Sequence, residues 1–176
     1  VSPLGQVDYP GNQEFCNNDN ISINFTTDNT GGDTTYSWTN TNSAIGLSSS
    51  GTGNINVTAT NTTNDPITSS VTVTPSFEGC EGTPHTFTIT VNPVPSIENI
   101  EQEVCTGSGI AITPSDGTIP SGTTYSWDAP TSSPSGAITG GNSGTDETTI
   151  TESELLNSTN SPAVLTYTVT PTTPDG

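Results

Sequence analysis

The sequence predicts an all-β fold built from tandem antiparallel β-sandwiches of the immunoglobulin type. Three observations predict it: short segments in which apolar and polar residues alternate, clusters of turn-forming residues between them, and a series of motifs that occurs twice in the same order. Alternation with a period of two directs apolar side chains to one face of a strand and polar side chains to the other. Short strands joined by frequent turns are typical of sandwiches.

The composition alone would favour disorder. Leu, Ile, Val and Phe make up only 32 of 176 residues, and the net charge is −18. The alternation decides against disorder because it recurs in five segments: residues 21–25 (ISINF), 54–60 (NINVTAT), 70–75 (SVTVTP), 86–91 (TFTITV) and 165–171 (LTYTVTP). No convincing helical period is present, and the best helical candidate is the short segment TESELLNS, residues 151–158.

An internal repeat of about ninety residues organises the chain. QEFC at residues 13–16 returns as QEVC 89 residues later, and TTYSW at residues 34–38 returns unchanged at the same offset. NTTNDP at residues 61–66 returns as NSTNSP with an offset of 96. The second copy therefore carries about seven extra residues, which fall in the Gly-rich segment 135–147, and a surface loop tolerates such a change in length.

The repeat defines the expected domains. Residues 91–95 (VNPVP) close the first copy, and VSP at the start of the chain resembles the same closing motif. We therefore assign residues 1–3 to the tail of a preceding repeat, residues 4–94 to a complete repeat, and residues 95–176 to a second repeat that lacks its last strand. More repeats of this kind are expected on both sides.

The aromatic residues of the repeated motif are the expected core. Tyr36 and Trp38 are two residues apart, as are Tyr125 and Trp127, so each pair shares one face of a strand. Each large aromatic side chain can bury about 150–250 Å², which is a large share of a core so poor in apolar residues. In the alternative, both tryptophans point outward and form a platform for sugar rings.

The charge composition excludes several functions. The chain has no Lys and no Arg, so it has no cations to neutralise the phosphates of a nucleic acid or to bind an anionic membrane surface. No apolar run approaches the ~20 residues that span a bilayer, so no membrane insertion is expected. Catalysis is not expected either: His85 is the only histidine, and no motif supplies it with a nucleophile and an orienting group.

The three cysteines predict a disulfide. Cys16 and Cys105 are equivalent in the two copies, and Cys80 precedes the last strand of the first. The simplest pairing is Cys16 with Cys80, leaving Cys105 to pair with a residue beyond Gly176; pairing of Cys80 with Cys105 and free thiols are the alternatives. A disulfide would indicate an oxidising, extracytoplasmic location. Three cysteines and one distant histidine lack the spacing of a zinc site.

Acidic residues are the only candidate metal ligands. Glu98, Glu101 and Glu103 follow the closing motif of the first copy, where carboxylates could bind Ca²⁺ and stiffen a tandem array. No EF-hand type loop is present, and the alternative is a solvated surface that keeps the chain soluble. No other cofactor is expected. A second acidic stretch, open to the same two interpretations, consists of Asp146, Glu147, Glu152 and Glu154.

Taken together, these motifs resemble the PKD-like repeats of giant surface proteins in Bacteroidota, most closely those of the SprB-type gliding-motility adhesins of flavobacteria. The resemblance rests on VNPVPSI, QEVC-x-G, the Trp motif, SPAVLTYTVTP and C-x-G-x-x-x-x-F-T-I-T-V-N-P, and it covers nearly the whole chain. The chain departs from the PKD signature W-D-F-G-D-G: SWTNTN and SWDAPT stand in its place, so only the Trp strand carries over, with Asp128 as a partial match.

The resemblance implies spacer repeats of a long filament on the outer cell surface, exported by the type IX secretion system. Its partners would be the neighbouring repeats, extracellular surfaces or polysaccharide, and, through other parts of the parent protein, the gliding and secretion machinery. The alternative function is that of a carbohydrate-binding module in a secreted multidomain protein.

Overall fold

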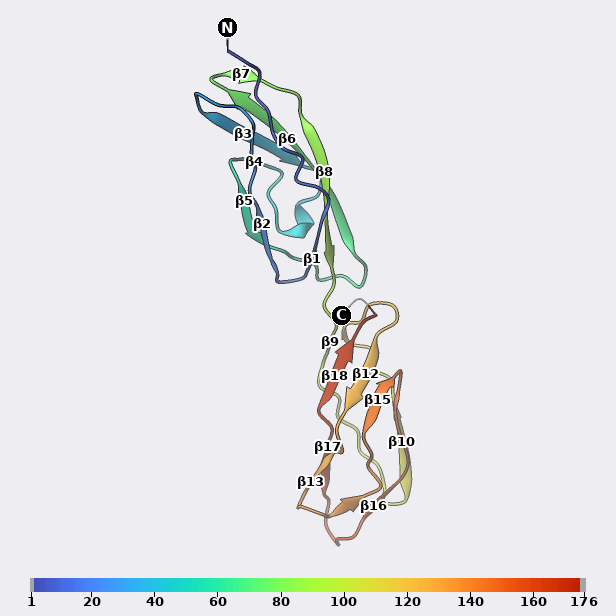
Figure 1. Cartoon of the computed structure of the whole chain (residues 1–176). Coiled ribbons are helices and arrows are strands. Elements are labelled where there is room, and N and C mark those ends of the chain that lie inside the picture. Colours follow the sequence, from blue (N-terminus) through green and yellow to red (C-terminus); the bar gives the residue numbers. More distant parts are fainter. Residues whose placement is uncertain (1, 175–176) are drawn as a thin grey trace. The chain divides into compact units, whose positions relative to one another are not determined.

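The computed structural model describes residues 2–174, which fold as two compact units that meet in sequence between Val94 and Pro95 (Figure 1). We call them unit 1 and unit 2. Both units are built from β-strands, and a single 3-10 turn, η1 (Ser43–Ile45), is the only helical element among the described residues. No helix in the described part of the chain has the length and apolar character to cross a membrane. The predicted all-β fold of antiparallel, immunoglobulin-like sandwiches is confirmed.

Unit 1 has two layers of strands. The main sheet has the order β1-β8-β6-β3-β4, with β7 paired to the end of β6. Its neighbours are antiparallel except β1 and β8, which run parallel. The facing layer is the antiparallel pair β2 and β5. The strands are β1 (Gln13–Cys16), β2 (Asn20–Ile23), β3 (Thr34–Asn40), β4 (Ser50–Thr52), β5 (Ile55–Thr58), β6 (Ile67–Phe77), β7 (Cys80–Glu81) and β8 (His85–Asn92).

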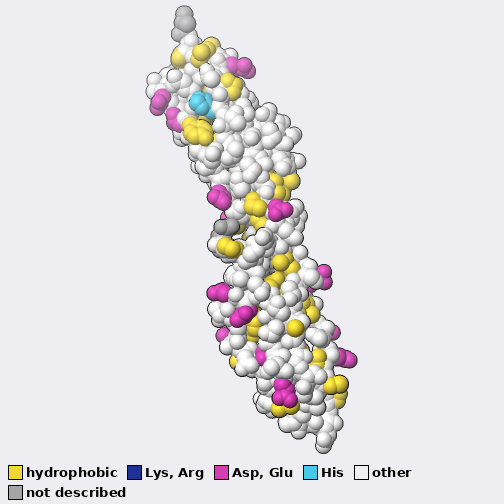
Figure 2. Space-filling view, turned by 90° about the vertical axis from the view of Figure 1, so that its right-hand side faces the viewer, with side chains coloured by type: hydrophobic (Ala, Val, Ile, Leu, Met, Phe, Trp, Pro, Cys, Tyr) yellow, Lys and Arg dark blue, Asp and Glu magenta, His cyan; other side chains and the backbone are white. Residues whose placement is uncertain are grey.

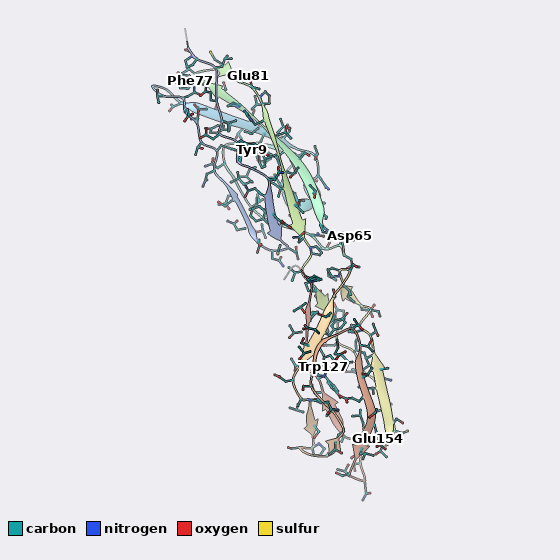
Figure 3. The ribbon with its side chains drawn as sticks, turned by 45° about the vertical axis from the view of Figure 1, so that its right-hand side comes forward. Tyr9, Asp65, Phe77, Glu81, Trp127 and Glu154 are labelled. Carbon is teal, nitrogen blue, oxygen red and sulfur yellow. The ribbon has the colours of Figure 1, made fainter. Side chains whose placement is uncertain are left out.

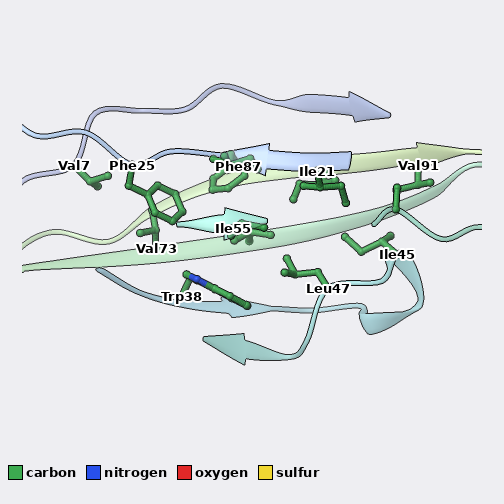
Figure 4. Packing of buried hydrophobic residues seen from close by; sticks show 14 residues of the cluster. Val7, Ile21, Phe25, Trp38, Ile45, Leu47, Ile55, Val73, Phe87 and Val91 are labelled. Carbon is green, nitrogen blue, oxygen red and sulfur yellow. The ribbon is translucent and has the colours of Figure 1, made fainter. Parts of the chain in front are cut away.

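Alternation places the core of unit 1 between these layers (Figure 4). On β8, Phe87, Ile89 and Val91 are fully buried while the intervening threonines face outward. η1 and the residues after it close one side of the core with Ile45 and Leu47. The cluster contains 14 buried apolar residues, enough to offset the low apolar content of the sequence.

Unit 2 is divided into more separate strand pairings than unit 1. β12 lies between β15 and β18, β17 pairs with β13, β16 pairs with β10 and β14, and β9 pairs with β11. The strands are β9 (Ser96–Ile97), β10 (Ser108–Ile112), β11 (Gly117–Thr118), β12 (Thr124–Trp127), β13 (Thr131–Ser133), β14 (Ile138–Thr139), β15 (Gly144–Glu147), β16 (Ile150–Asn157), β17 (Val164–Thr166) and β18 (Val169–Thr172).

A proline divides the tryptophan strand of unit 2. In unit 1, β3 pairs with β6 without interruption over seven residues. In unit 2 the corresponding ladder stops at Trp127 and resumes at Thr131. Pro130 lies in the gap, and because proline has no amide hydrogen it cannot donate to a ladder. The sequence SWDAPT thus produces two short strands where SWTNTN forms one.

The helical candidate, residues 151–158, is a strand. It lies almost entirely within β16. Glu152 and Leu155 are both buried, and this spacing of three imitates a helical period. The cause is a register shift in the pairing with β10 between Ser108 and Ile110, where β16 has one residue more than β10.

Candidate functional site

The repeated tryptophan makes the same two kinds of contact in both units, one with a glycine on the neighbouring strand and one with a backbone carbonyl. Trp38 on β3 lies opposite Gly51, and its indole nitrogen donates a hydrogen bond of 3.1 Å to the Gly53 carbonyl. Trp127 on β12 lies opposite Gly144, and its indole nitrogen donates a bond of 2.9 Å to the Asn142 carbonyl. Both acceptors lie 15 residues after the tryptophan.

Glycine is required opposite each tryptophan because the indole lies directly against the neighbouring strand. A Cβ atom added to Gly51 would lie 2.2 Å from Cζ2 of Trp38, and one added to Gly144 would lie 2.4 Å from Cζ2 of Trp127. The tryptophans are only 8% and 7% exposed, so neither offers a ring face to a sugar. This Trp–Gly contact is an element of the core.

The tyrosines of the motif accompany the tryptophans inward. Tyr125 is buried, and Tyr36 is half-buried with its ring centroid 5.4 Å from that of Phe25. Burial raises the pKa of both phenols above the usual value of 10.0. Both groups are therefore neutral over the physiological pH range.

A turn held by the side chain of an asparagine is also repeated in the two units. In unit 1, Asn61 donates to the Asp65 carbonyl at 2.9 Å, and its own oxygen accepts from the amide and the hydroxyl of Thr63 at 2.9 and 2.7 Å. In unit 2, Asn157 makes the same bonds, donating to Ser161 at 2.9 Å and accepting from Thr159 at 2.9 and 2.8 Å. The side chains replace backbone partners in both turns.

Unit 2 contains one polar cluster that unit 1 lacks, and we call it the Glu152 cluster. Glu152 is 6% exposed. One of its carboxylate oxygens accepts from the Asn142 amide at 2.7 Å and from the Tyr167 hydroxyl at 3.0 Å, and the other accepts from the Asn142 side chain at 2.8 Å. Because the Asn142 carbonyl receives the Trp127 indole, the carboxylate also fixes the tryptophan's acceptor.

The sequence places Glu152 in an acidic stretch that is either a calcium site or a solvated surface, and it does not predict that this side chain is buried. Glu152 lies opposite Ile110 just as the partly buried Val57 lies opposite Ile21, and this equivalence depends on the register of β16 against β10, which the sequence does not show. The three hydrogen bonds of the Glu152 carboxylate replace lost hydration. Burial, followed by the bond to Glu152 and the charge of that residue, raises the pKa of Tyr167 well above 10.0.

The outer face of the main sheet of unit 1 carries hydroxyl groups. The Thr68 and Thr90 hydroxyls are 2.9 Å apart, and those of Thr72 and Thr86 are 2.8 Å apart. No charged residue points outward from the middle of these strands, whereas acidic side chains are spread over other parts of the surface (Figure 2). The outward residues of β3, β6 and β8 are Thr35, Ser37, Thr39, Thr68, Ser70, Thr72, Thr74, Ser76, Thr86, Thr88, Thr90 and Asn92.

The predicted calcium ligands are not gathered into a site. Glu98, Glu101 and Glu103 are all exposed. Within residues 2–174 no three side chains of His, Cys, Asp or Glu come together as metal ligands would. The solvated interpretation fits these three residues and also Asp146, Glu147 and Glu154, which are exposed.

The structure contradicts the predicted Cys16–Cys80 disulfide, and all three cysteines are free. Cys16 lies beside Asn92 at the end of β8, next to the start of β6, whereas Cys80 pairs with Phe77 at the other end of β6. β6 spans 11 residues, or about 33 Å at ~3.3 Å per residue. A disulfide requires Cα atoms within about 7 Å.

The two ends of unit 1 are visible in Figure 3, where Phe77 and Glu81 lie together and Asp65 lies far from them. Cys105 is exposed, and its predicted pairing beyond Gly176 falls outside the described residues. His85, the only histidine, is exposed at the start of β8 although it has the same parity as the buried Phe87.

The match to known proteins agrees with this architecture. A family model of the PKD-like domain matches residues 13–95 and, a second time, residues 102–176. No curated protein matches the chain at a significant level. PKD-like domains are generally non-catalytic and typically extracellular, and they commonly sit in multidomain surface proteins. The two matches cover most of the sequence, and the chain therefore belongs to the PKD-like domain family, of which it contains two copies.

Proposed function

We propose that the chain is a run of spacer repeats in a long, secreted cell-surface filament of the SprB-type adhesin class, exported by the type IX secretion system. The construction of one unit twice supports this proposal. Both units have the same Trp–Gly contact and the same asparagine turn. These contacts are internal to each unit and stabilise its fold. A spacer needs such internal devices in every unit and needs no reaction centre in any.

The β1–β8 pair suits unit 1 to bearing tension. β1 and β8 run parallel over four residue pairs, from Gln13 with Ile89 to Cys16 with Asn92. β1 lies toward the amino-terminal side of the unit, and β8 ends two residues before Val94. Pulling the two ends apart loads this pair in shear, so that several hydrogen bonds must break together. Pro93 and Pro95, which flank Val94, fix their own φ angles and restrict the residue before each of them, so the backbone from Asn92 to Pro95 has little freedom to bend.

Surface labelling of the source cells tests this function. An antiserum raised against the chain is expected to label long filaments on intact cells, and a strain without the type IX translocon is expected to lose the surface label while the protein accumulates inside. Labelling that appears only after permeabilisation would contradict a surface role. Surface labelling that persists without the translocon would contradict this export route alone.

A carbohydrate-binding module is the second candidate, and the hydroxyl-bearing face of unit 1 favours it. A shallow depression on this side is lined by hydroxyl groups, together with Tyr36 and Glu81. The buried tryptophans weigh against it, because neither can stack on a sugar. Affinity electrophoresis in gels that contain soluble polysaccharides separates the two: the spacer function predicts unchanged mobility, and retardation would favour the module.

A further inference from the structure

The strands β17 and β18 of unit 2 leave one edge open. In unit 1, the equivalent strand β6 is central, with β3 on one side and β8 on the other. In unit 2, β18 pairs only with β12 and β17 only with β13 among residues 2–174. The equivalence is set by the registers, since Trp38 lies opposite Val73 and Trp127 opposite Val169. The open edge thus corresponds to the position of β8.

The side chains along this edge lack the cover that β8 gives to unit 1. Val71 and Val73 on β6 are 0% exposed, whereas their counterparts Tyr167 and Val169 are only partly buried. Val164, at the start of β17, is 63% exposed. The core cluster of unit 2 accordingly has three buried members, Tyr125, Trp127 and Ile150.

Polar groups at this edge also lack the hydrogen-bond partners that β8 provides in unit 1. Asn61 donates one hydrogen bond to its own turn and a second, of 2.8 Å, to the carbonyl of Val91 on β8. Its counterpart Asn157 makes the bond to its own turn, and in the described part of unit 2 no carbonyl takes the place of Val91. The QEVC segment, residues 102–105, is exposed and forms no strand, although its counterpart β1 pairs with β8.

We infer that unit 2 binds one further β-strand at this edge, antiparallel to β17 and β18 and parallel to residues 102–105, and that the occupant has the chemistry of β8. β8 alternates Phe87, Ile89 and Val91 with threonine and carries no carboxylate. Such a segment supplies apolar side chains to the half-buried core positions, hydroxyls to the outer face, and a carbonyl to Asn157. It also adds no negative charge to a chain of net charge −18.

The register of unit 1 predicts how the occupant lies. Val71 faces Phe87 and Ser69 faces Ile89, so Tyr167 is expected opposite the Phe position and Leu165 opposite the Ile position. This mode of recognition is β-strand addition, in which backbone hydrogen bonds supply affinity and the alternate side chains supply specificity. An occupant with shifted alternation would present threonine to the core.

The test uses the full chain and a synthetic peptide of residues 82–93, GTPHTFTITVNP. The peptide is expected to raise the melting temperature of unit 2 by roughly 10 °C when present at 100 times its Kd, and to protect the amides of β17 and β18 from hydrogen exchange. The control peptide has the same composition with the alternation destroyed, and it is expected to have no effect. Equal stabilisation by both peptides, or by neither, would overturn the inference.

A chain variant locates the binding edge. Val169 and Pro171 have the same parity on β18, and because Pro171 has no amide hydrogen to donate to β12, the amides of this parity face the open side. Val169→Pro should therefore leave the pairing with β12 intact and abolish the peptide effect, while Val169→Ala should retain it. Peptide binding that survives Val169→Pro would contradict this edge as the site.

A second copy of the chain is the rival occupant. Pairing of two open edges would make the chain dimeric, with a mass that rises with concentration in sedimentation experiments. The inference predicts a monomer with or without peptide. A dimer that the peptide does not dissociate would assign the edge to self-association instead.

Discussion

Units 1 and 2 share one set of local devices and differ in how completely their cores are closed. Each has a tryptophan packed against a glycine and a turn built on asparagine. Unit 1 surrounds these with 14 buried apolar residues, whereas the cluster in unit 2 has three. β8 accounts for part of the difference, because it supplies three fully buried side chains to unit 1 and pairs with β6, whose Val71 and Val73 are also fully buried. The tryptophan strand therefore organises a unit, and the last strand completes its core.

The first prediction tests the role of β8 in unit 1. Phe87→Ala should lower the free energy of unfolding of unit 1 by about 3–5 kcal/mol, the usual cost of removing a buried phenyl ring. Unit 2 should be unaffected, because Phe87 belongs to the other core. Urea denaturation of a Trp127→Phe background, in which only Trp38 reports, measures the effect. A loss below 1 kcal/mol would mean that β8 does not determine the difference between the units.

The second prediction tests what the units share. Gly51→Ala and Gly144→Ala should each destabilise their own unit by about 1–3 kcal/mol, since the new methyl group overlaps the indole. Ser50→Ala, at an exposed neighbouring position on the same strand, is the matched control. Differential scanning calorimetry resolves the two transitions. If only one glycine proved sensitive, the Trp–Gly contact would not be a common device.

The third prediction concerns the cluster that only unit 2 has. Glu152→Ala should cost unit 2 about 1–3 kcal/mol, because it leaves the amide of Asn142 and the hydroxyl of Tyr167 without their acceptor. Glu152→Gln keeps an acceptor oxygen and should cost less. The unit 2 transition in calorimetry reports both values. An alanine variant as stable as the parent would show that the Glu152 cluster does not stabilise unit 2.

Much of the fold could be predicted from local pattern. The alternation in TFTITV and in TTYSW gave the strands β8, β3 and β12, because burial of one strand face is a local property of sequence. Glu152 could not be placed, since its burial depends on the shifted register between β10 and β16, a contact between distant segments.

The cysteine prediction failed for a related reason. It assumed that the start of the sandwich lies near its final hairpin. β1 runs parallel to β8 and carries Cys16 to the far end of that strand, and the direction of pairing between segments so distant in sequence is not encoded in either one.

The fourth prediction is a difference between the units at alkaline pH. The folded-state pKa of Tyr167 is raised above 10.0, first by burial and then by Glu152. Its contribution to the stability of unit 2 is therefore complete below pH 10 and is lost as the pH rises above 10 toward the folded-state pKa. Tyr167→Phe should make the urea midpoint of unit 2 less sensitive to pH between 9 and 11. Equal slopes for variant and parent would show that this phenol is not shielded.

The smallest effect is expected at the cysteines. Because Cys16 and Cys80 lie at opposite ends of β6, the double variant Cys16→Ser and Cys80→Ser should change the stability of unit 1 by less than about 0.5 kcal/mol, whereas a disulfide closing this loop would contribute roughly 4 kcal/mol. Thiol titration of the unreduced, unfolded chain should find all three thiols. One thiol instead of three, together with a large loss in the double variant, would restore the disulfide. It would also mean that β1 does not lie along β8, and the comparison of the two cores, which depends on the position of β8 in unit 1, would fail with it.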